Sequence, residues 1–331
     1  MSNITIKDVA KKANVSISTV SLVLNGKAEN IPDVTIEKVK DACRTLNYKR
    51  NMNASSLKSK VSKLAGLIVP DLENSYYSRV ASCISTILYE RGYSLVISSC
   101  DNNFEKEVDY INQMAARQVD ALFLFPSAIG LSDKNKPLLK KTLDDCGLKI
   151  IILDRQTFLN SYIEVVNDDF YGATLACQFL VNKGFKRIAC ITGPKNVSSS
   201  DDRLAGYLEV VKQNGIFDES LIYVGDYHSE LARIQARLIL QRNDVDAIFA
   251  FNDLSAYAVY EVAGELNKKV GEDIFVVGYD NNPFSALITP KLTSVGQNIN
   301  EMCQIAVDRM FDKRNVIETI KVRPTLVERD E

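Results

Sequence analysis

The sequence predicts a small all-α head followed by a large α/β body whose parallel sheets form two lobes. Three short stretches with helical spacing of apolar residues predict the head, and they end before about residue 48. From about residue 62, strand-length apolar runs alternate with amphipathic helical segments, which predicts parallel sheets covered on both faces. The chain has 331 residues, of which 46% are hydrophobic, so two or three domains with well-buried cores are expected.

The head contains the spacing of a helix-turn-helix motif. A first helix is expected after the N-cap residue Thr5, and Asn14 tolerates the left-handed conformation that a tight turn requires. Ser16 caps a second helix that runs to about Leu24, and a supporting third helix covers about 32–47, with Pro32 in its first turn. In such a motif the second helix enters the major groove of DNA with its N-terminal residues nearest the bases. The residues expected to face DNA on this basis are Ser16, Ile17, Ser18 and Ser21.

The charge distribution favours a polyanionic partner for the head. Residues 1–63 contain 12 Lys and Arg against 5 Asp and Glu, a balance of +7. The remainder contains 28 against 37, a balance of −9, and the two balances sum to the net charge of −2. A basic head on an acidic body is typical of a protein that meets nucleic acid at one end only, while a basic solvated tail would give the same count.

Several motifs recur at fixed spacing within the first sixty residues. They are Thr5-Ile6-Lys7-Asp8-Val9-Ala10, Val15-Ser16-x-x-Thr19-Val20-Ser21, Leu24-Asn25, Leu46-Asn47-Tyr48 and Asn51-x-x-Ala54-x-x-Leu57. Together they closely resemble the head and hinge of the lactose-repressor/galactose-repressor (LacI–GalR) family of transcription regulators. The alternative is a helical bundle that does not bind DNA and carries the pattern by coincidence.

The resemblance implies that residues 51–57 form a hinge helix only on operator DNA, paired with the same segment of a second subunit. A helix this short is not stable alone, because nucleation is costly below ~12 residues. By resemblance Leu57 wedges between base pairs in the minor groove; otherwise it is a plain linker residue. Lys49 and Arg50 are expected to contact phosphate. The full expected DNA-binding set is Thr5, Ser16, Ile17, Ser18, Ser21, Leu22, Asn25, Lys49, Arg50, Ala54 and Leu57.

Two head positions depart from the family pattern. Leu22 stands where an arginine is common, and Arg50 replaces a frequent proline before the hinge. An arginine reads guanine through two hydrogen bonds, whereas a leucine makes only apolar contact, for example with a thymine methyl group. We therefore expect the DNA half-site to differ from the common family operator at the base pair that Leu22 meets.

The resemblance extends over the body. Gly193-Pro194, Arg203-x-x-Gly206-Tyr207, Asn252-Asp253 and Gly278-Tyr279-Asp280-Asn281 match the family's sensor domain, which is similar to periplasmic sugar-binding proteins. The resemblance implies that the chain crosses between lobes three times, near 163, 294 and 323. The expected organisation is a helix-turn-helix head (1–48), a hinge (49–61) and an effector-binding and dimerisation domain (62–331). Its N-lobe covers about 62–163 plus 295–322, and its C-lobe covers about 164–294 plus 323–331.

The effector site is expected at the carboxyl ends of the strands, where open parallel sheets bind ligands. The resemblance points to a cleft made by Tyr76, Tyr77, Arg155, Arg203, Tyr227, Asn252 and Asp280. Arginine and aspartate suit neighbouring hydroxyl groups and a tyrosine ring suits the apolar face of a sugar, so a sugar is the preferred effector. A purine stacked on the tyrosines is the alternative. Structural roles compete as well: Asp280 as a turn cap, Arg203 as a surface ion pair, and Asp168 and Asp169 as helix N-caps.

The composition argues against other classes of protein. His228 is the only histidine and the seven cysteines are scattered, so no catalytic residue, metal site or cofactor is expected. The N-terminus lacks the apolar core of an export signal and no run is long enough to span a membrane, which favours a cytoplasmic protein. A sugar-binding receptor without a DNA role and an α/β enzyme are the competing classes. We expect a homodimer on palindromic DNA, and no tetramer because no leucine heptad follows the final strands.

Overall fold

The computed structural model describes residues 4–24, 26–48, 61–314 and 316–329. The chain folds as two compact units, 1–62 and 63–331. Each unit is described by itself below.

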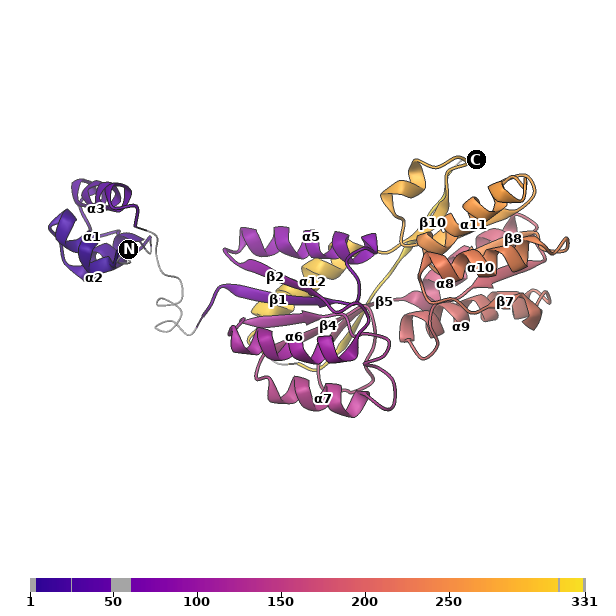
Figure 1. The fold of residues 1–331 in the computed structure, drawn as a ribbon, viewed down its shortest axis with the longest axis horizontal. Coiled ribbons are helices and arrows are strands. Elements are labelled where there is room, and N and C mark those ends of the chain that lie inside the picture. Colours follow the sequence, from indigo (N-terminus) through magenta and orange to yellow (C-terminus); the bar gives the residue numbers. More distant parts are fainter. Residues whose placement is uncertain (1–3, 25, 49–60, 315, 330–331) are drawn as a thin grey trace. The chain divides into compact units, whose positions relative to one another are not determined.

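The first unit is the predicted helix-turn-helix head (Figure 1). Its helices are α1 (Ile6–Ala13), α2 (Ile17–Leu24) and α3 (Asp33–Thr45). The Asp8 carboxylate accepts hydrogen bonds from the Thr5 amide at 2.8 Å and hydroxyl at 2.7 Å, which fixes the start of α1. Asn14 has the expected left-handed backbone, with φ 53°. The Ser16 hydroxyl accepts from the Thr19 amide at 3.0 Å and caps α2.

The third helix is shorter at both ends than predicted. Pro32 is its N-cap and not a residue of its first turn, so α3 begins one residue later. Asn47 has φ 48°, and the Tyr48 amide donates to the Cys43 carbonyl at 2.9 Å. A left-handed residue with this bond ends a helix, which explains why α3 stops at Thr45.

The head has a small core and an exposed α2 face. Its buried apolar residues are Val9, Ala10, Ala13, Val20, Val39 and Ala42. On α2 only Val20 is buried, whereas Ile17 is 45% and Leu22 is 42% exposed. This small core packs the three helices together, and it leaves the apolar side chains of Ile17 and Leu22 on α2 exposed.

The N-lobe of the second unit is a six-stranded parallel sheet in the order β11-β5-β4-β3-β1-β2. Its strands are β1 (Leu64–Val69), β2 (Ser94–Ser99), β3 (Ala121–Leu124), β4 (Lys149–Leu153), β5 (Ile163–Asn167) and β11 (Thr319–Val322). Helices α5 (Ser75–Glu90) and α12 (Ile299–Phe311) pack on one face, and α6 (Phe104–Ala116) and α7 (Lys136–Asp145) on the other (Figure 1).

The C-lobe repeats this plan with one antiparallel edge strand. The order is β12-β10-β9-β8-β6-β7, and only the β10–β12 pair is antiparallel. Its strands are β6 (Ile188–Ile191), β7 (Ile222–Tyr223), β8 (Ala247–Ala250), β9 (Phe275–Tyr279), β10 (Thr293–Gly296) and β12 (Thr325–Val327). Helices α8 (Asp169–Asn182) and α9 (Ser198–Gln213) cover one face, and α10 (Ser229–Leu240) and α11 (Asp253–Glu265) the other. Two short 3₁₀ helices, η1 (Glu219–Leu221) and η2 (Pro283–Ala286), lie in loops.

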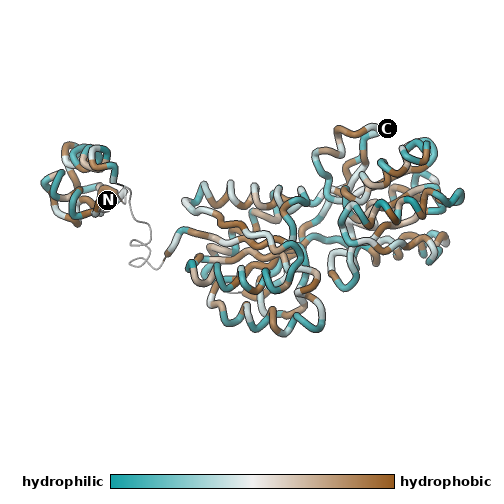
Figure 2. The backbone as a smooth tube through the Cα atoms, in the orientation of Figure 1, coloured by the Kyte–Doolittle hydropathy of each residue, from teal (hydrophilic) through white to brown (hydrophobic). Residues whose placement is uncertain are grey.

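The central strands of both sheets are buried on both faces, as their continuous apolar runs predict. In Figure 2 they form hydrophobic interiors between helices of mixed hydropathy. Phe123 on β3 and Phe249 on β8 are each 0% exposed. Removing such a side chain from water stabilises the fold by about 1.5–3 kcal/mol. The two-lobed α/β architecture expected from the sequence is confirmed.

The chain crosses between the lobes after Asn167, after Gly296 and after Val322. The first crossing lies later than residue 163, because Ile163–Asn167 forms β5 between β4 and β11 of the N-lobe sheet. The second lies later than residue 294, because Thr293–Gly296 pairs with β9. Polar residues next to these crossings are therefore held between the lobes.

Candidate functional site

The described residues that the sequence predicts to face DNA lie mainly at the start of α2 and on its exposed side. Ser16, Ile17, Ser18 and Leu22 are exposed, as is Thr5, and Ser21 is half-buried. The Ser16 hydroxyl lies 2.8 Å from both the Ser18 and the Thr19 hydroxyl, which forms a polar cluster at the helix start. The predicted positions Asn25, Lys49, Arg50, Ala54 and Leu57 lie outside the described residues.

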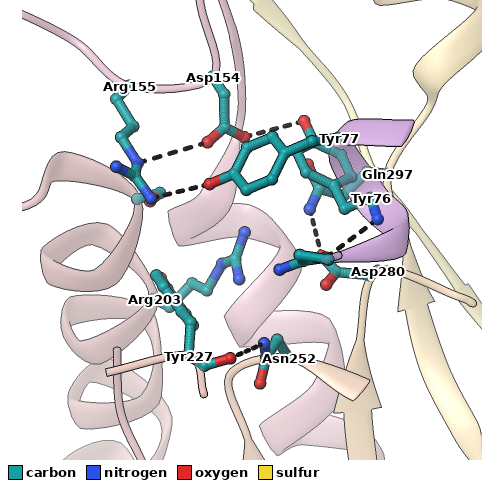
Figure 3. Close-up of a pocket in the computed structure, with 11 residues that line it drawn as sticks. Tyr76, Tyr77, Asp154, Arg155, Arg203, Tyr227, Asn252, Asp280 and Gln297 are labelled. Carbon is teal, nitrogen blue, oxygen red and sulfur yellow. Dashed lines mark hydrogen bonds and ion pairs between the residues drawn. The ribbon is translucent and has the colours of Figure 1, made fainter. Parts of the chain in front are cut away.

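A small pocket in the second unit lies between the N-lobe and the C-lobe, with a cavity volume of about 20 Å³. All seven predicted effector residues line it (Figure 3). The complete lining is Asn74, Tyr76, Tyr77, Asp154, Arg155, Ser199, Arg203, Tyr227, Asn252, Asp280 and Gln297. The carboxyl ends of the strands in both lobes therefore converge, as open parallel sheets require.

Two aspartates occupy equivalent places at strand ends. Asp154 follows β4 and has φ 68°, and Asp280 follows β9 and has φ 106°. Positive φ is strained for a residue with a Cβ and persists where the surroundings enforce it, often at ligand sites. Both carboxyl groups are nearly buried, at 5% and 7% exposure. Both aspartates line the pocket.

The N-lobe side of the pocket is a tyrosine–arginine–aspartate network. The Tyr76 hydroxyl donates to Asp154 Oδ1 at 2.9 Å. The Arg155 guanidinium donates to the Tyr77 hydroxyl at 2.8 Å and to the Pro126 carbonyl at 2.9 Å. Arg155 Nε lies 3.9 Å from Asp154 Oδ2 and has no hydrogen-bond partner among the described residues. A buried donor without a partner is costly, so this nitrogen is available to a ligand.

The C-lobe side is built around Arg203. Its Nε donates to Asp169 Oδ1 at 2.8 Å, and its Nη1 donates to the Phe251 carbonyl. The guanidinium carbon lies 3.7 Å from the centre of the Tyr279 ring and 5.6 Å from that of Tyr227. These contacts fix the position of the guanidinium group. The third nitrogen, Nη2, takes part in neither of the two hydrogen bonds. Asp169 was expected to be a helix N-cap; the structure instead pairs it with Arg203, while Asp168 caps α8.

Asn252 and Tyr227 are held by the same lobe. Asn252 Oδ1 accepts from the Ser255 amide at 3.0 Å, which caps α11, and its Nδ2 donates to the Tyr227 carbonyl at 3.0 Å. The Tyr227 ring lies against Gly193, where a Cβ would overlap the ring. The predicted Gly193-Pro194 motif therefore makes room for a pocket aromatic.

Burial sets the protonation of Asp280. It raises the pKa of this carboxyl group to about 8, although the charge of Arg203 opposes the rise. Asp280 therefore holds a proton at neutral pH and can both donate and accept. Burial also raises the pKa of the Tyr77 hydroxyl, so it stays protonated. The pocket thus combines carboxyl, hydroxyl, amide and guanidinium groups with complementary hydrogen-bonding roles.

The lobes also touch each other directly around the pocket. Arg79 Nη1 donates to the carbonyls of Asp280 at 3.1 Å and Asn281 at 3.0 Å. On the opposite side the Gln156 amide donates to the Ser198 hydroxyl at 2.8 Å. Both contacts join the N-lobe to the C-lobe, so the structure represents a closed arrangement of the two.

Gln297 and Ser199 line the pocket but were not singled out from the sequence. Gln297 Nε2 donates to Asp280, and its Oε1 accepts from Asn167 Nδ2. Gln297 directly follows the buried strand Thr293–Gly296, whose threonine and serine hide it from a search for apolar runs. Ser199 lies in the first turn of α9.

Comparisons with known proteins agree with this fold. Residues 5–51 match the model described as "Bacterial regulatory proteins, lacI family", and residues 177–330 match "Periplasmic binding protein-like domain". The HTH-type transcriptional repressor PurR of Edwardsiella ictaluri is 32% identical over 332 residues, covering 98% of this chain and 96% of that protein. The chain belongs to the LacI family of bacterial regulatory proteins.

Solved structures of LacI-family regulators superimpose on the whole chain. The Lac repressor dimer bound to operator and the anti-inducer ONPF has a TM-score of 0.86 and 27% identity, covering 99% of this chain and 98% of that one. The complex of the transcriptional regulator CelR with cellobiose has a TM-score of 0.71 and 28% identity, covering 98% and 99%. This protein is accordingly a DNA-binding transcriptional regulator with a domain that binds a small molecule, and not an enzyme.

Two features are absent from the part of the chain that the structure describes. None of their helices has the length and apolar character needed to cross a bilayer. Within the same residues, no cluster of three or more His, Cys, Asp and Glu side chains is arranged to hold a metal ion.

Proposed function

We propose that this regulator is a homodimeric repressor of palindromic operators and that a neutral sugar bound between its lobes controls DNA affinity. The observation that supports a sugar is the set of donors and acceptors that converge on one small pocket. Each sugar hydroxyl donates and accepts, so it suits carboxyl groups beside guanidinium groups. The roles of Tyr76, Tyr77, Arg155, Arg203, Tyr227, Asn252 and Asp280 as effector contacts are part of this proposal.

The charges favour a neutral ligand over a sugar phosphate. Arg203 is neutralised by Asp169 at 2.8 Å, and Arg155 lies beside Asp154. Among the described lining residues, Arg155 and Arg203 are the only cations, and Asp154 and Asp280 are carboxyl groups. A phosphate would place two negative charges in a nearly buried site whose two arginines already lie beside aspartates, which is costly.

The ring geometry favours a sugar over a flat base. A purine is the second candidate because of the tyrosines. However, the Tyr76 and Tyr77 rings pack edge to face at 61°, and Tyr77 meets Phe125 at 79°, so these rings do not form a parallel pair around a flat base.

A thermal-shift screen of the full chain tests the effector class. Neutral monosaccharides, their phosphates and free purines are compared at matched concentrations. We expect a monosaccharide to stabilise the protein, by about 2.7 kcal/mol at one hundred times its Kd. Stabilisation by purines or phosphates alone would contradict the sugar proposal without touching the DNA-binding function.

Dimerisation follows from the requirements of DNA recognition. One head contacts too little DNA for useful specificity, and two heads on a symmetric site double the readout. The Lac repressor structure named above is a dimer on operator DNA, which supports the same assembly here. A cytoplasmic location is part of the proposal, because the operator is genomic DNA.

Leu22 is proposed to set the base preference that separates this protein from relatives with arginine. Its side chain is 42% exposed on α2. Selection from random DNA should return a half-site without guanine at the base pair it meets, and Leu22→Arg should restore a guanine there. Thr45→Arg adds the same charge on the exposed end of α3 and should raise affinity for all sequences alike. An unchanged preference in Leu22→Arg would overturn this assignment.

A further inference from the structure

Two cysteines that do not line the effector pocket meet where α5 packs against α12. The Cys83 thiol donates to Asn300 Oδ1 at 3.5 Å, and Asn300 precedes Cys303 by one helical turn. Reciprocally, the Cys303 thiol donates to the Val80 carbonyl at 3.8 Å, and Val80 precedes Cys83 by one turn. Residues one turn apart lie on the same helix face, so both sulfur atoms are at one crossing point. The two thiols are close enough for each to shift the pKa of the other.

The two sulfur atoms differ in their access to solvent. Cys83 is half-buried, whereas Cys303 is 0% exposed. Cys83 lines a surface groove between α5 and α12, and Cys303 does not. The groove lining is Arg79, Ser82, Cys83, Thr86, Ile87, Ile299, Asn300 and Gln304, of which Arg79 alone is ionised. A small solute therefore reaches Cys83 first, in a groove with a positive charge, and Cys303 lies behind it.

The neighbouring thiols are chemically unequal. The Cys303 side chain lowers the pKa of Cys83 to about 7, while partial burial acts in the opposite direction. The Cys83 side chain, together with burial, raises the pKa of Cys303. Burial raises the pKa of the other half-buried cysteines, Cys43 and Cys146. Cys83 therefore ionises more readily than Cys303, which is the order needed for an attacking and a resolving cysteine.

We propose that Cys83 and Cys303 are a dithiol modification site that a hydroperoxide oxidises to an intramolecular disulfide. The Cys83 thiolate attacks one oxygen of the hydroperoxide; an S–O bond forms, the O–O bond breaks, and the leaving oxygen takes a proton from water. Sulfur loses two electrons and the hydroperoxide gains them, giving a sulfenic acid and an alcohol, or water from hydrogen peroxide. The Cys303 sulfur then attacks the Cys83 sulfur; the S–S bond forms, and the hydroxyl leaves with the Cys303 proton as water.

The position of the pair connects this chemistry to the ligand-binding body. Helix α5 also carries Tyr76 and Tyr77 of the pocket, and α12 begins directly after the second crossing. Arg79, one turn before Cys83, donates to the C-lobe carbonyls of Asp280 and Asn281. A disulfide would join the two helices beside this contact between the lobes.

Peptide mapping of the full chain tests the site. The reduced, desalted protein is treated at pH 7 with hydrogen peroxide or, in parallel, with tert-butyl hydroperoxide, and free thiols are then alkylated. Non-reducing mass spectrometry should find one Cys83–Cys303 disulfide, which dithiothreitol reverses. Cys303→Ser should leave a sulfenic acid on Cys83 that dimedone traps, and Cys83→Ser should leave Cys303 as a free thiol. Cys146→Ser, the matched control, should form the disulfide as the parent does.

Alkylation rates provide a second measurement that does not depend on disulfide formation. At pH 7 a thiol with a pKa near 7 is half ionised, and one with a pKa near 9 is about 1% ionised. The weaker nucleophilicity of the more acidic thiolate reduces this advantage, so Cys83 should react about fivefold faster or more than Cys43 and Cys146. Equal rates would overturn the proposal, as would over-oxidation of Cys83 while Cys303 stays free to alkylate.

Discussion

The two lobes each present one arginine to the same pocket, but they hold it in different ways. Arg203 of the C-lobe donates to the Asp169 carboxylate, and its guanidinium carbon lies 3.7 Å from the centre of the Tyr279 ring. Arg155 of the N-lobe donates to neutral acceptors, the Tyr77 hydroxyl and the Pro126 carbonyl. Its Nε lies 3.9 Å from Asp154 and has no hydrogen-bond partner among the described residues. The C-lobe arginine is therefore hydrogen-bonded to its carboxylate, whereas the N-lobe arginine is only near one and keeps a donor for the ligand.

The largest effect should come from the neutralised arginine. Arg203→Ala leaves Asp169 buried at 1% exposure without its cation, so the free energy of unfolding should fall by about 3–5 kcal/mol in urea titrations. Arg233→Ala is the matched control, because Arg233 pairs with Glu261 and Glu265 at the surface and should cost less than about 1 kcal/mol. A similar small loss in both variants would show that Arg203 is not held as described.

Arg155 should respond in binding more than in stability. Arg155→Ala removes hydrogen bonds from a charged donor, each worth about 1.5–3 kcal/mol, so effector Kd should rise about tenfold to a hundredfold in calorimetry. The loss of unfolding free energy should be smaller than for Arg203→Ala. Arg155→Lys keeps the charge without the planar fork and should fall between the parent and the alanine variant. Equal destabilisation by both arginine-to-alanine changes would remove the contrast between the lobes.

The aspartates at the strand ends allow a pH test of the same contrast. Burial raises the pKa of Asp280 to about 8 from its ordinary value of 3.8, so the folded state keeps a proton that the unfolded state has lost. The contribution of Asp280 to stability is therefore full below about pH 4 and declines as pH rises toward 8. Asp280→Asn mimics the protonated form, so its Tm advantage over the parent should grow between pH 5 and pH 8. A constant difference across this range would mean that Asp280 ionises normally.

A smaller effect is expected from the glycine beside Tyr227. Gly193→Ala would place a Cβ into the Tyr227 ring and displace it, so effector affinity should fall a few-fold while DNA binding without effector is kept. Gly264→Ala on α11 meets nothing within 4 Å and should be neutral or slightly stabilising. An unchanged effector affinity in Gly193→Ala would remove Tyr227 from the list of effector contacts.

The sequence predicted the architecture because it follows local patterns, and the resemblance to the LacI family pointed to most of the pocket. Apolar runs such as Leu64–Val69 identify buried strands, and polar residues just after them, such as Asp280, identify the ligand side of a sheet. The helix-turn-helix head was equally readable, since the caps Thr5 and Ser16 and the left-handed Asn14 are local signals.

The remainder depended on contacts between distant segments. Strand β5 escaped prediction because Glu164 interrupts its apolar run; this glutamate is 5% exposed and accepts from the Thr157 amide at 2.9 Å. Helix α12 follows strands of the C-lobe but covers the sheet of the N-lobe, and only the family resemblance placed its residues in the N-lobe. The pairing of Asp169 with Arg203 joins residues far apart in the chain, so the sequence suggested only a helix cap for Asp169.

Asn167 and Gln297 belong to two different connections between the lobes, and their side chains hydrogen-bond to each other. Gln297 also binds Asp280 within the pocket. Any rotation of one lobe against the other must turn these connections. It must therefore disturb the Gln297 amide, which also lines the pocket. Occupancy of the pocket and the stiffness of the pivot then change together, with no relay of residues required between them.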